Sequence, residues 1–380
     1  MVENPKVSII WVNYNSKSFI DISIKSLESL TELDYPNYEV IVIDNHSIDG
    51  SFEIIKKYVE SKNKYFKIFR TQRNIGFTGG NNLGFKMRDK DSKYVVLVNN
   101  DAIIYPESLK KIIEWMESES QVGAGQGVVL APSGKIEGIG YMLDELLTSH
   151  GVFRGMDASI ANKPLSVTYV VGAYAVYNVR AVMEVWGGEE RLFFDWGFGY
   201  FDDHVLGLQL WNTGWKCRAY PVLSCVHQQS MSFKRGSPLR VYLSFRNLLL
   251  LNAITNSRYK NLVPLLAVRD AIPRIMRACR GGTGRAATLA LWKSLLDYNT
   301  IKEKIIKFNK IRKLDLYKAP IIKLNLSEVG YLLILRRKIT DKISKRILSD
   351  FKLRQSSGSF YDLNILMSNI SINNAKRIKS

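Results

Sequence analysis

The sequence predicts an α/β protein: a mostly parallel central sheet covered by helices, followed by a basic, mainly helical C-terminal region. Over the first 120 residues, short apolar segments alternate with amphipathic helical segments. The apolar segments are apolar on both faces, which is typical of strands in a parallel sheet covered on both sides. Charge separates the C-terminal region, because residues 1–240 hold 26 Lys and Arg against 27 Asp and Glu, whereas residues 241–380 hold 28 against 8.

The elements of the first 120 residues are placed by their hydrophobic periodicity. Strands are predicted at Val7–Asn13, Tyr38–Asp44, Phe66–Arg70 and Tyr94–Asn99. Helices are predicted over residues 20–30, from Gly50 or Ser51 to about Val59, near residues 80–88, and from Pro106, which suits a first helical position. The buried face of the last helix is marked by Leu109, Ile112, Ile113 and Met116.

Three regions are expected along the 380 residues. Residues 1–240 are predicted to form the α/β domain, with one half at 1–120 and a more irregular half at 121–240. Residues 241–350 are the basic helical region, and residues 351–380, rich in Ser, Asn and Lys, form a tail expected to be poorly ordered. The apolar content of 46% and the charged content of 23% exclude a wholly disordered chain.

The sequence also indicates the cellular compartment of the protein. No apolar run approaches the roughly 18 residues of a membrane-spanning helix, and the N-terminus lacks the apolar core of a signal peptide. Cys217, Cys225 and Cys279 are odd in number and form no C-x-x-C pair, so they are predicted to be reduced thiols. We therefore expect a cytoplasmic protein.

Polar side chains follow three of the predicted strands. They are Asn13, Tyr14 and Asn15, then Asp44 and Asn45, then Asn99, Asn100 and Asp101. Ligands of such sheets bind beyond the carboxyl ends of the strands, so the coincidence indicates a binding site. The alternative is that Asn and Asp form turns and helix caps, which explains any one group but less readily all three.

Asn99 and Asp101 stand two residues apart in an extended segment, so they are expected to face the same way. Their oxygens suit a hard divalent cation that completes its octahedron with substrate phosphates, although Asn-Asn-Asp also makes an ordinary turn. His227 follows another strand-like segment and would be a third ligand if Asp101 binds a metal. A lone histidine is otherwise more often structural.

Residues 73–82 hold several glycines just before a predicted helix, whose first amides could receive a phosphate. Their spacing is neither G-x-G-x-x-G nor that of a P-loop. This argues against a Rossmann dinucleotide site and against an ATPase.

Asp202 and Asp203 follow an aromatic, Gly-rich stretch and precede a predicted helix with Val205 and Leu208 facing inward. One of the two acids could cap the helix. Alternatively, a carboxylate desolvated by the aromatic residues has a raised pKa and serves as a general base. The pair alone leaves both interpretations open.

Seven motifs occur in a fixed order: Val12 to Ser16, Asp44 to Ser51, Asn74 to Gly84, Leu97 to Asp101, Gly187 and Gly188, Asp202 and Asp203, and His227. In this order the chain resembles family 2 glycosyltransferases, most closely the rhamnosyltransferase and galactofuranosyltransferase type. The resemblance covers roughly residues 6–250. It implies a GT-A fold over residues 1–240, with a nucleotide-diphosphate-sugar half followed by an acceptor half.

The resemblance also implies roles for single residues. It assigns nucleotide-sugar binding to Val12, Asn13, Asn15, Asp44, Asn74, Gly79, Asn99 and Asn100. Within this set, Asp44 would accept a hydrogen bond from the nucleotide base. The metal-binding D-x-D motif is matched by Asn99 and Asp101, and His227 would complete the shell around Mg²⁺ or Mn²⁺. The catalytic base is matched by Asp203, its acidic neighbour by Asp202, and a family Arg-Asn pair by Arg246 and Asn247.

The reaction that the resemblance implies is a single displacement with inversion. Asp203 would remove the proton from a hydroxyl of a glycan or lipid-linked acceptor, while the cation stabilises the departing diphosphate. The chain departs from the family at two places. Asn99 is a neutral ligand at the first D-x-D position, and the stretch between Gly188 and Asp202 is longer and lacks the usual Phe-Asp-Glu.

The basic C-terminal region allows two interpretations. A solvated charged face is the default for Lys-rich helices. Alternatively, residues 301–317 and 332–347 place Lys and Arg opposite Ile, Leu and Phe, which is typical of an interfacial helix on anionic lipid. The protein would then be peripheral on the inner face of the membrane.

Three other functions compete with glycosyl transfer. A nucleic-acid-binding protein is supported by charge alone, so nucleic acid is not expected as a partner. A GT-A scaffold that binds a sugar nucleotide without turnover is disfavoured by the presence of Asp101, Asp203 and His227. A nucleotidyltransferase is disfavoured because its Gly-rich N-terminal signature is absent.

Overall fold

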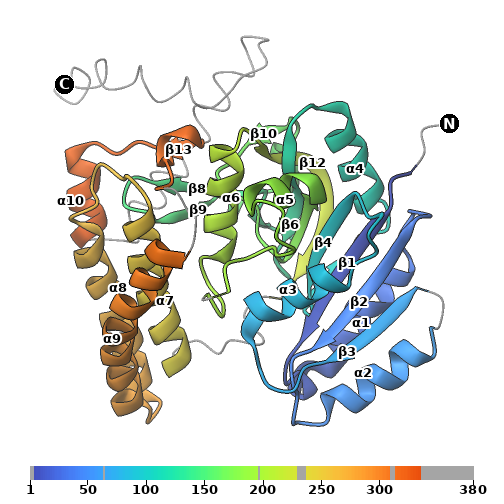
Figure 1. The fold of residues 1–380 in the computed structure, drawn as a ribbon, viewed down its shortest axis with the longest axis horizontal. Coiled ribbons are helices and arrows are strands. Elements are labelled where there is room, and N and C mark those ends of the chain that lie inside the picture. The colour runs from blue at the N-terminus through green and yellow to red at the C-terminus, as the bar shows by residue number, and fades with distance from the viewer. Residues whose placement is uncertain (1–3, 63–64, 196, 229–236, 309–312, 335–380) are drawn as a thin grey trace.

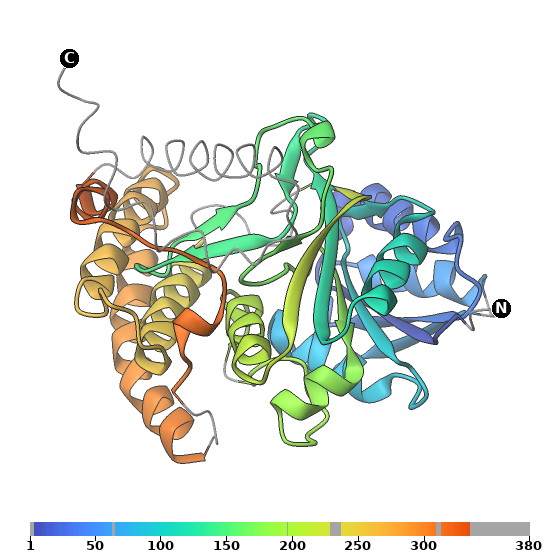
Figure 2. The same ribbon diagram turned by 90° about the horizontal axis from the view of Figure 1, so that it is seen from above.

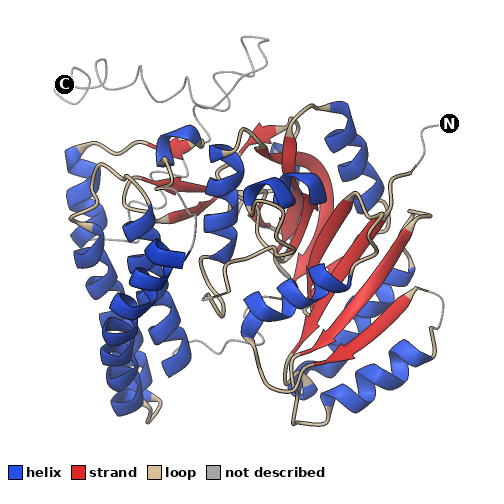
Figure 3. Cartoon of the chain, in the orientation of Figure 1, coloured by secondary structure: helices blue, strands red, loops and turns tan. Residues whose placement is uncertain are grey.

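A ten-stranded mixed sheet forms the centre of the molecule, and helices cover both of its faces (Figures 1 and 3). The computed structural model describes residues 4–62, 65–195, 197–228, 237–308 and 313–334. The strands of the large sheet are β1 (Val7–Asn13), β2 (Tyr38–Asp44), β3 (Phe66–Arg70), β4 (Tyr94–Asn99), β5 (Ala102–Ile104), β6 (Val122–Leu130), β7 (Ile136–Gly138), β10 (Leu165–Ser166), β11 (Tyr174–Asn178) and β12 (Lys216–His227). A smaller sheet contains β8 (Tyr141–Asp144), β9 (Ser149–Gly151) and β13 (Ile321–Ile322).

The described α-helices are α1 (Ile20–Thr31), α2 (Ser51–Glu60), α3 (Gly76–Met87), α4 (Ser108–Ser118), α5 (Val179–Val185), α6 (Asp202–Asn212), α7 (Pro238–Ile254), α8 (Val263–Arg280), α9 (Gly284–Phe308) and α10 (Leu326–Ile334). Figure 2 shows α7 to α10 gathered at one end of the molecule, beyond α6, with α1, α2 and α4 at the other end. The four strands predicted in the first 120 residues are confirmed at their predicted bounds.

The path through the large sheet is β10-β12-β6-β11-β4-β1-β2-β3. The pairs β2–β3, β1–β2 and β1–β4 are parallel, as predicted. β11 is antiparallel to both β4 and β6, and β12 runs parallel to β6. The sheet is therefore parallel from β4 through β1 and β2 to β3, and mixed in the rest.

The strand register brings the polar strand ends together. Asn13 is the partner of Asp44, and Val12 is the partner of Asn99, so β1, β2 and β4 end at one edge of the sheet. β5 pairs antiparallel with β12 and sets Ala102 opposite His227. The expectation that these side chains share one edge is confirmed.

Both faces of the parallel strands are buried, which explains why they are apolar on both sides. In β1, Ile10 belongs to the cluster that contains Phe85 of α3. Ile9 and Trp11 belong to the opposite cluster, which contains Leu27 of α1. Such a strand gains burial from every side chain, so its sequence shows no polar alternation.

Two predicted helix starts were wrong. The glycines expected before α3 lie inside it, because a Cβ on Gly84 would come within 2.5 Å of Ile10 Cγ2, so the glycine allows close packing on β1. α4 begins at Ser108, not at Pro106. Pro106 lies in the preceding turn, where its carbonyl oxygen accepts a 2.9 Å hydrogen bond from the Asp34 N–H.

The C-terminal helices share a hydrophobic core with the α/β part of the chain. Phe245 and Leu248 of α7 and Leu266 of α8 belong to the same buried cluster as Leu206 of α6 and Val152. The predicted boundary at residue 240 therefore separates two compositions but runs through one core.

The interfacial helix predicted over residues 301–317 was wrong. α9 ends at Phe308, the Leu314 N–H donates a 2.7 Å hydrogen bond to the Ile254 carbonyl, and Leu316 is fully buried. Two apolar side chains of the expected lipid-facing stripe, Leu314 and Leu316, are therefore buried in the protein core. Residues 335–347 of the second candidate segment and the whole predicted tail lie outside the described residues.

In the described part of the chain, we find no helix with the length and apolarity needed to cross a membrane. The three cysteines are free, with Cys217 and Cys225 buried and Cys279 exposed.

Gly207 tests the packing that positions α6. An added Cβ would lie 2.3 Å from Tyr169 Cβ and 2.7 Å from the Thr168 carbonyl oxygen. We expect Gly207→Ala to lower the free energy of unfolding by about 1–3 kcal/mol through overpacking, measured by urea denaturation.

The matched control is Gly330→Ala in α10, where an added Cβ meets nothing within 4 Å. Because alanine has a higher helix propensity than glycine, this substitution should leave the free energy of unfolding unchanged or raise it by up to about 1 kcal/mol. Equal effects at the two glycines would show that α6 is not held by this close contact.

Candidate active site

Asp44 is fully buried at the end of β2, and its carboxylate holds the neighbouring loop. Asn13 Nδ2 donates a 2.9 Å hydrogen bond to its Oδ1, and the Ser47 N–H donates a 3.0 Å bond to its Oδ2. Arg70 Nε lies 3.4 Å from the same Oδ2. Two residues expected to bind the nucleotide, Asn13 and Asp44, thus form one hydrogen-bonded unit, and the contact of Asp44 with a base stays a prediction.

This edge of the sheet is also lined by other residues that are expected to bind the nucleotide sugar. Asn15 adopts a φ of 47° and accepts a 2.9 Å hydrogen bond from the Ile48 N–H. Val12 is half-buried at the end of β1, against α3. Asn74 Oδ1 accepts hydrogen bonds from Asn45 Nδ2 at 2.9 Å and from a following backbone amide at 2.8 Å. These contacts shape the loops around the edge.

Backbone N–H groups near the start of α3 donate hydrogen bonds to oxygens of the protein. The Ile75 N–H donates to Asn45 Oδ1 at 2.9 Å, and the Thr78 N–H donates to the Phe198 carbonyl at 3.5 Å. Protein oxygens thus accept from some of the amides at this helix start, and the binding of a phosphate there stays a prediction. Gly79, on the first turn of the helix, is half-buried.

Asp101, Asn99 and His227 converge beside Asp44's edge of the sheet. His227 Nε2 lies 3.1 Å from Asp101 Oδ1 and 3.3 Å from Asn99 Nδ2. The prediction that Asn99 and Asp101 face the same position is therefore confirmed. Asn100 lies toward the end of β1, where its Nδ2 is 3.4 Å from Asn13 Oδ1.

Glu137 is a second partner of His227 that sequence patterns did not indicate. Its Oε2 lies 2.9 Å from His227 Nδ1. Burial lowers the pKa of His227, but hydrogen bonds to the carboxylates of Asp101 and Glu137 outweigh burial and raise this pKa to about 10. An imidazolium between two carboxylates is thereby stabilised, and a cation bound at Nε2 would compete with that proton.

The donors at this edge fit a divalent cation that is also held by substrate. Within the described ranges, no three His, Cys, Asp or Glu side chains are grouped so as to hold a metal ion. A carboxylate, an imidazole nitrogen and a carboxamide nevertheless meet at Asp101, His227 and Asn99, and this mixed O and N set suits Mn²⁺ or Mg²⁺. The set is incomplete without further oxygens.

The two adjacent acids at the start of α6 differ in their surroundings. Asp202 is buried, and its Oδ1 accepts a 2.8 Å hydrogen bond from Thr78 Oγ1. Asp203 accepts a hydrogen bond from the Gly172 N–H, while its Oδ1 is buried and has no hydrogen-bond partner among the described residues. One acid is therefore bonded to α3, and the other has an unpaired carboxylate oxygen.

Burial raises the pKa of both acids. It raises the pKa of Asp202 to about 8, with a further increase from the Asp203 charge. It raises the pKa of Asp203 to about 7, against the lowering effect of the Gly172 N–H. A carboxyl that titrates near neutral pH can both accept and release a proton. The assignment of Asp203 as a base stays a prediction.

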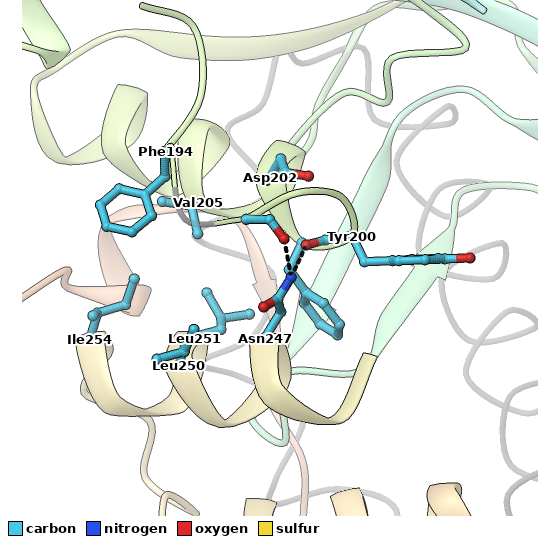
Figure 4. A pocket seen from close by; sticks show the side chains of 10 residues that line it. Phe194, Tyr200, Asp202, Val205, Asn247, Leu250, Leu251 and Ile254 are labelled. Atoms are coloured by element: carbon cyan, nitrogen blue, oxygen red, sulfur yellow. Dashed lines mark hydrogen bonds between the residues drawn. The ribbon is translucent and has the colours of Figure 1, made fainter. Parts of the chain in front are cut away.

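The loop before these acids is held in an unfavourable backbone conformation. Phe198, Tyr200 and Phe201 have φ values of 62°, 67° and 66°, and non-glycine residues rarely adopt this region. Asn247 Nδ2 lies within 2.8–3.1 Å of three carbonyl oxygens of the loop, and Arg246 donates to one of them at 2.8 Å. Figure 4 shows Asn247 reaching from α7 to this loop. The Arg-Asn pair therefore acts as a clamp on the loop.

One short segment links the acid pair to the edge that carries Asn99 and Asp101. The Gly172 N–H bonds Asp203, and the next residue, Ala173, accepts a 3.2 Å hydrogen bond at its carbonyl from the Asn99 N–H. The segment connects two residues that are 104 positions apart in sequence.

Comparison with known proteins identifies the first half of the chain. The family described as "Glycosyl transferase family 2" matches residues 8–186. These residues form a family 2 glycosyltransferase domain. An uncharacterized glycosyltransferase of Haemophilus influenzae is 31% identical over 120 residues, which are 32% of this chain and 35% of that protein. The chain thus spans about a third of the length of this relative.

Two solved structures resemble the fold. Staphylococcus aureus TarS 1–349 in complex with UDP-GlcNAc matches with a TM-score of 0.52 and 16% identity, over 94% of this chain and 93% of that one. GalNAc-T7 with UDP, GalNAc and Mn²⁺ matches with a TM-score of 0.55 and 14% identity, over 71% and 51%. The glycosyltransferase domain has the GT-A fold that its motifs implied.

Several contacts of this glycosyltransferase site were missed by sequence reasoning. Thr78 lies inside a recognised motif, so its hydroxyl could have been considered as a partner of Asp202. Glu137 and Gly172 lie outside the recognised motifs, and only the pairing of distant strands brings them to the site.

The pKa of Asp202 predicts how stability depends on pH. Its folded-state pKa of about 8 lies above the value of about 3.9 in an unfolded chain. The folded protein therefore keeps a proton that the unfolded chain loses, and this carboxyl stabilises the fold at low pH but not above about pH 8. Asn does not titrate, so we expect the midpoint temperature of Asp202→Asn to rise relative to wild type between pH 5 and pH 8.

Thermal unfolding of both proteins across this pH range measures the difference. The control is Asp157→Asn, which changes an exposed carboxylate and should show no such trend. A difference between Asp202→Asn and wild type that does not change with pH would contradict the raised pKa.

Proposed function

We propose that this chain is an inverting glycosyltransferase. It moves a sugar from a nucleotide-diphosphate donor to a hydroxyl of a glycan or lipid-linked acceptor, with Asp203 as the general base. A divalent cation held by Asp101, Asn99 and His227 assists the transfer. The rhamnosyl or galactofuranosyl type stays open within this proposal.

The observation that carries the proposal is the position of Asp203. Its Oδ1 is buried without a partner, and its pKa of about 7 suits a base at neutral pH. The Gly172 N–H donates to this carboxylate, and the next residue, Ala173, accepts a hydrogen bond from the Asn99 N–H at the edge where the polar strand ends meet.

The donor would lie along the edge formed by β1, β2 and β4. In this proposal Asp44 accepts a hydrogen bond from the base, within the pocket made by Val12, Asn13, Asn15, Asn74, Gly79, Asn99 and Asn100. Because TarS was solved with UDP-GlcNAc and GalNAc-T7 with UDP and Mn²⁺, uridine nucleotides and Mn²⁺ are the first ligands to test.

The proposed chemical step is a single displacement at the anomeric carbon of the donor sugar. Asp203 takes the proton of the acceptor hydroxyl while the hydroxyl oxygen bonds the anomeric carbon. The bond from that carbon to the diphosphate oxygen breaks, its electron pair leaves with the diphosphate, and the configuration inverts. The cation, when bound, supplies positive charge next to the leaving diphosphate. Asp202, tied to Thr78, keeps the start of α6 in place.

Asp203→Asn tests this assignment. We expect the rate of nucleoside diphosphate release from the donor to fall by about 10²–10⁴-fold, because the base is removed. Donor binding, followed by thermal shift, should stay as in wild type, because Asp203 serves the acceptor. Asp195→Asn on the same loop, with an exposed side chain, is the matched control and should retain activity.

Other outcomes would select a rival function. Joint loss of donor binding and turnover in Asp203→Asn would make Asp203 structural. Donor binding by wild type with no turnover under any condition would favour a non-catalytic scaffold. Stabilisation by nucleic acid and by no sugar nucleotide would favour a nucleic-acid-binding protein.

We also propose peripheral attachment to an anionic membrane, now through α8 and α9. These helices leave seven large apolar side chains between 48% and 71% exposed: Leu265, Val268, Ile272, Met276, Leu289, Trp292 and Leu296. In each helix they recur every three or four residues, on the side away from buried Ala271 and Ala287. Exposed basic residues, including Arg277, Arg280 and Lys293, accompany them, a composition typical of interfacial helices.

Sedimentation with vesicles tests this attachment. We expect binding to phosphatidylglycerol vesicles at low salt, weaker binding at high salt, and none to phosphatidylcholine. Ile272→Ser with Trp292→Ser should abolish it, whereas Ile54→Ser, which changes an exposed apolar residue of α2 at the other end of the molecule (Figure 1), should not. Failure of wild type to sediment with anionic vesicles would contradict the proposal.

A further inference from the structure

A cavity of about 230 Å³ lies beside the residues that flank the acid pair. Its walls come from the loop before β9, the start of α6, α7 and α8. Phe201 and His204, the residues on either side of Asp202 and Asp203, both line it. The volume is far above the roughly 10–15 Å³ that admits one water molecule, so the cavity has room for part of a substrate.

Arg240, on the first turn of α7, is a cation without a counter-ion in this cavity. Its NH1 group is buried and makes no hydrogen bond to any described residue. Its guanidinium lies 5.7 Å from the centre of the Tyr200 ring, which holds the side chain against the wall. A buried, unsatisfied donor on a charged group is costly, and an anion in the cavity would remove that cost.

Arginines outnumber acids among the described residues that line the cavity. Arg274 of α8 also lines the wall. Asp270 is the only acid among the lining residues, and its Oδ1 accepts a 3.0 Å hydrogen bond from Arg269 Nε on the same helix. Burial lowers the pKa of His204 to about 3, so its ring is neutral.

His204 offers a second polar group that has no partner. Its ring stacks on Tyr169 at 4.1 Å between centroids, and its Nδ1 is buried without a hydrogen bond. Tyr169 also lies close enough to Asp203 for that carboxylate to raise its pKa. The polar side of the cavity therefore reaches the surroundings of Asp203, while Phe245 and Leu248 make the opposite wall apolar.

We propose that this cavity binds an anionic group of the acceptor, a phosphate monoester or diester, with Arg240 as its main ligand and Arg274 as the second. The guanidinium fork of Arg matches two phosphate oxygens. Bound there, the phosphate orients the acceptor so that its hydroxyl meets Asp203. This inference rests on the proposed glycosyl transfer, and it narrows the acceptor to molecules that carry phosphate near the sugar-accepting hydroxyl.

Calorimetric titration with phosphate probes tests the site directly. Inorganic phosphate, glycerol 3-phosphate and octyl phosphate are titrated into the full chain in the presence of EDTA, which excludes binding through a metal. We expect Arg240→Gln to weaken the binding of each bound probe by about tenfold or more. Arg240→Lys keeps the charge and should fall between wild type and Arg240→Gln.

The matched control is Arg180→Gln, which removes an exposed arginine of α5 outside the lining of the cavity and should bind like wild type. Tighter binding of octyl phosphate than of glycerol 3-phosphate would indicate a lipid-linked phosphate, and the reverse order a phosphate within a glycan. Equal affinity of wild type and folded Arg240→Gln for all probes, or no binding by wild type, would overturn the inference.

Donor binding, measured on the same samples, separates this inference from the proposed function. If wild type binds a sugar nucleotide but phosphate binding does not depend on Arg240, the phosphate site is wrong and the glycosyl transfer stands. If no sugar nucleotide binds or turns over, the proposed function and the acceptor role of the cavity both fail, even where Arg240 binds phosphate.

Discussion

The clamp between α7 and the loop before α6 is the contact on which the site depends most. Three non-glycine residues of this loop have positive φ, at about 1–3 kcal/mol each, and such a loop persists only when its surroundings hold it. Asn247 and Arg246 do so through the carbonyls of Gly197, Gly199 and Tyr200. The basic C-terminal region is thereby part of the active site, because its first helix fixes the loop that carries both acids.

Burial raises the pKa of both Asp202 and Asp203, but the two acids differ in their hydrogen bonds. Asp202 is buried and accepts a hydrogen bond from Thr78, and the folded structure stabilises the protonated form of this carboxyl. Asp203 keeps an unpaired oxygen and a pKa near neutral. Both acids thus titrate near neutral pH, but only Asp202 is hydrogen-bonded to α3.

Much of the structure of residues 1–120 could be predicted, because the strands and their ends follow from patterns between residues close together in the sequence. The strand ends at Asn13, Asp44 and Asn99 follow from apolar runs and from the rule that parallel strands end at one edge. Helix starts were predicted less well, since the glycines of α3 serve packing against β1 and not a turn.

Contacts between distant segments could not be predicted from sequence patterns. Glu137 reaches His227 only because β7, β6 and β12 are neighbours in the sheet. The cavity at Arg240 needs four elements to meet, and burial of Leu316 shows that an apolar stripe can face the core instead of a membrane.

The most direct test of the proposed donor site is thermal unfolding with UDP-, dTDP- and GDP-sugars, with and without Mn²⁺, in wild type and Asp101→Asn. One nucleotide class should raise the wild-type midpoint in a Mn²⁺-dependent manner, since a ligand at a hundred times its Kd adds about 2.7 kcal/mol. Asp101→Asn should lose the Mn²⁺-dependent part. No shift with any donor, or an equal shift in the variant, would contradict a metal-assisted donor site at this edge of the sheet.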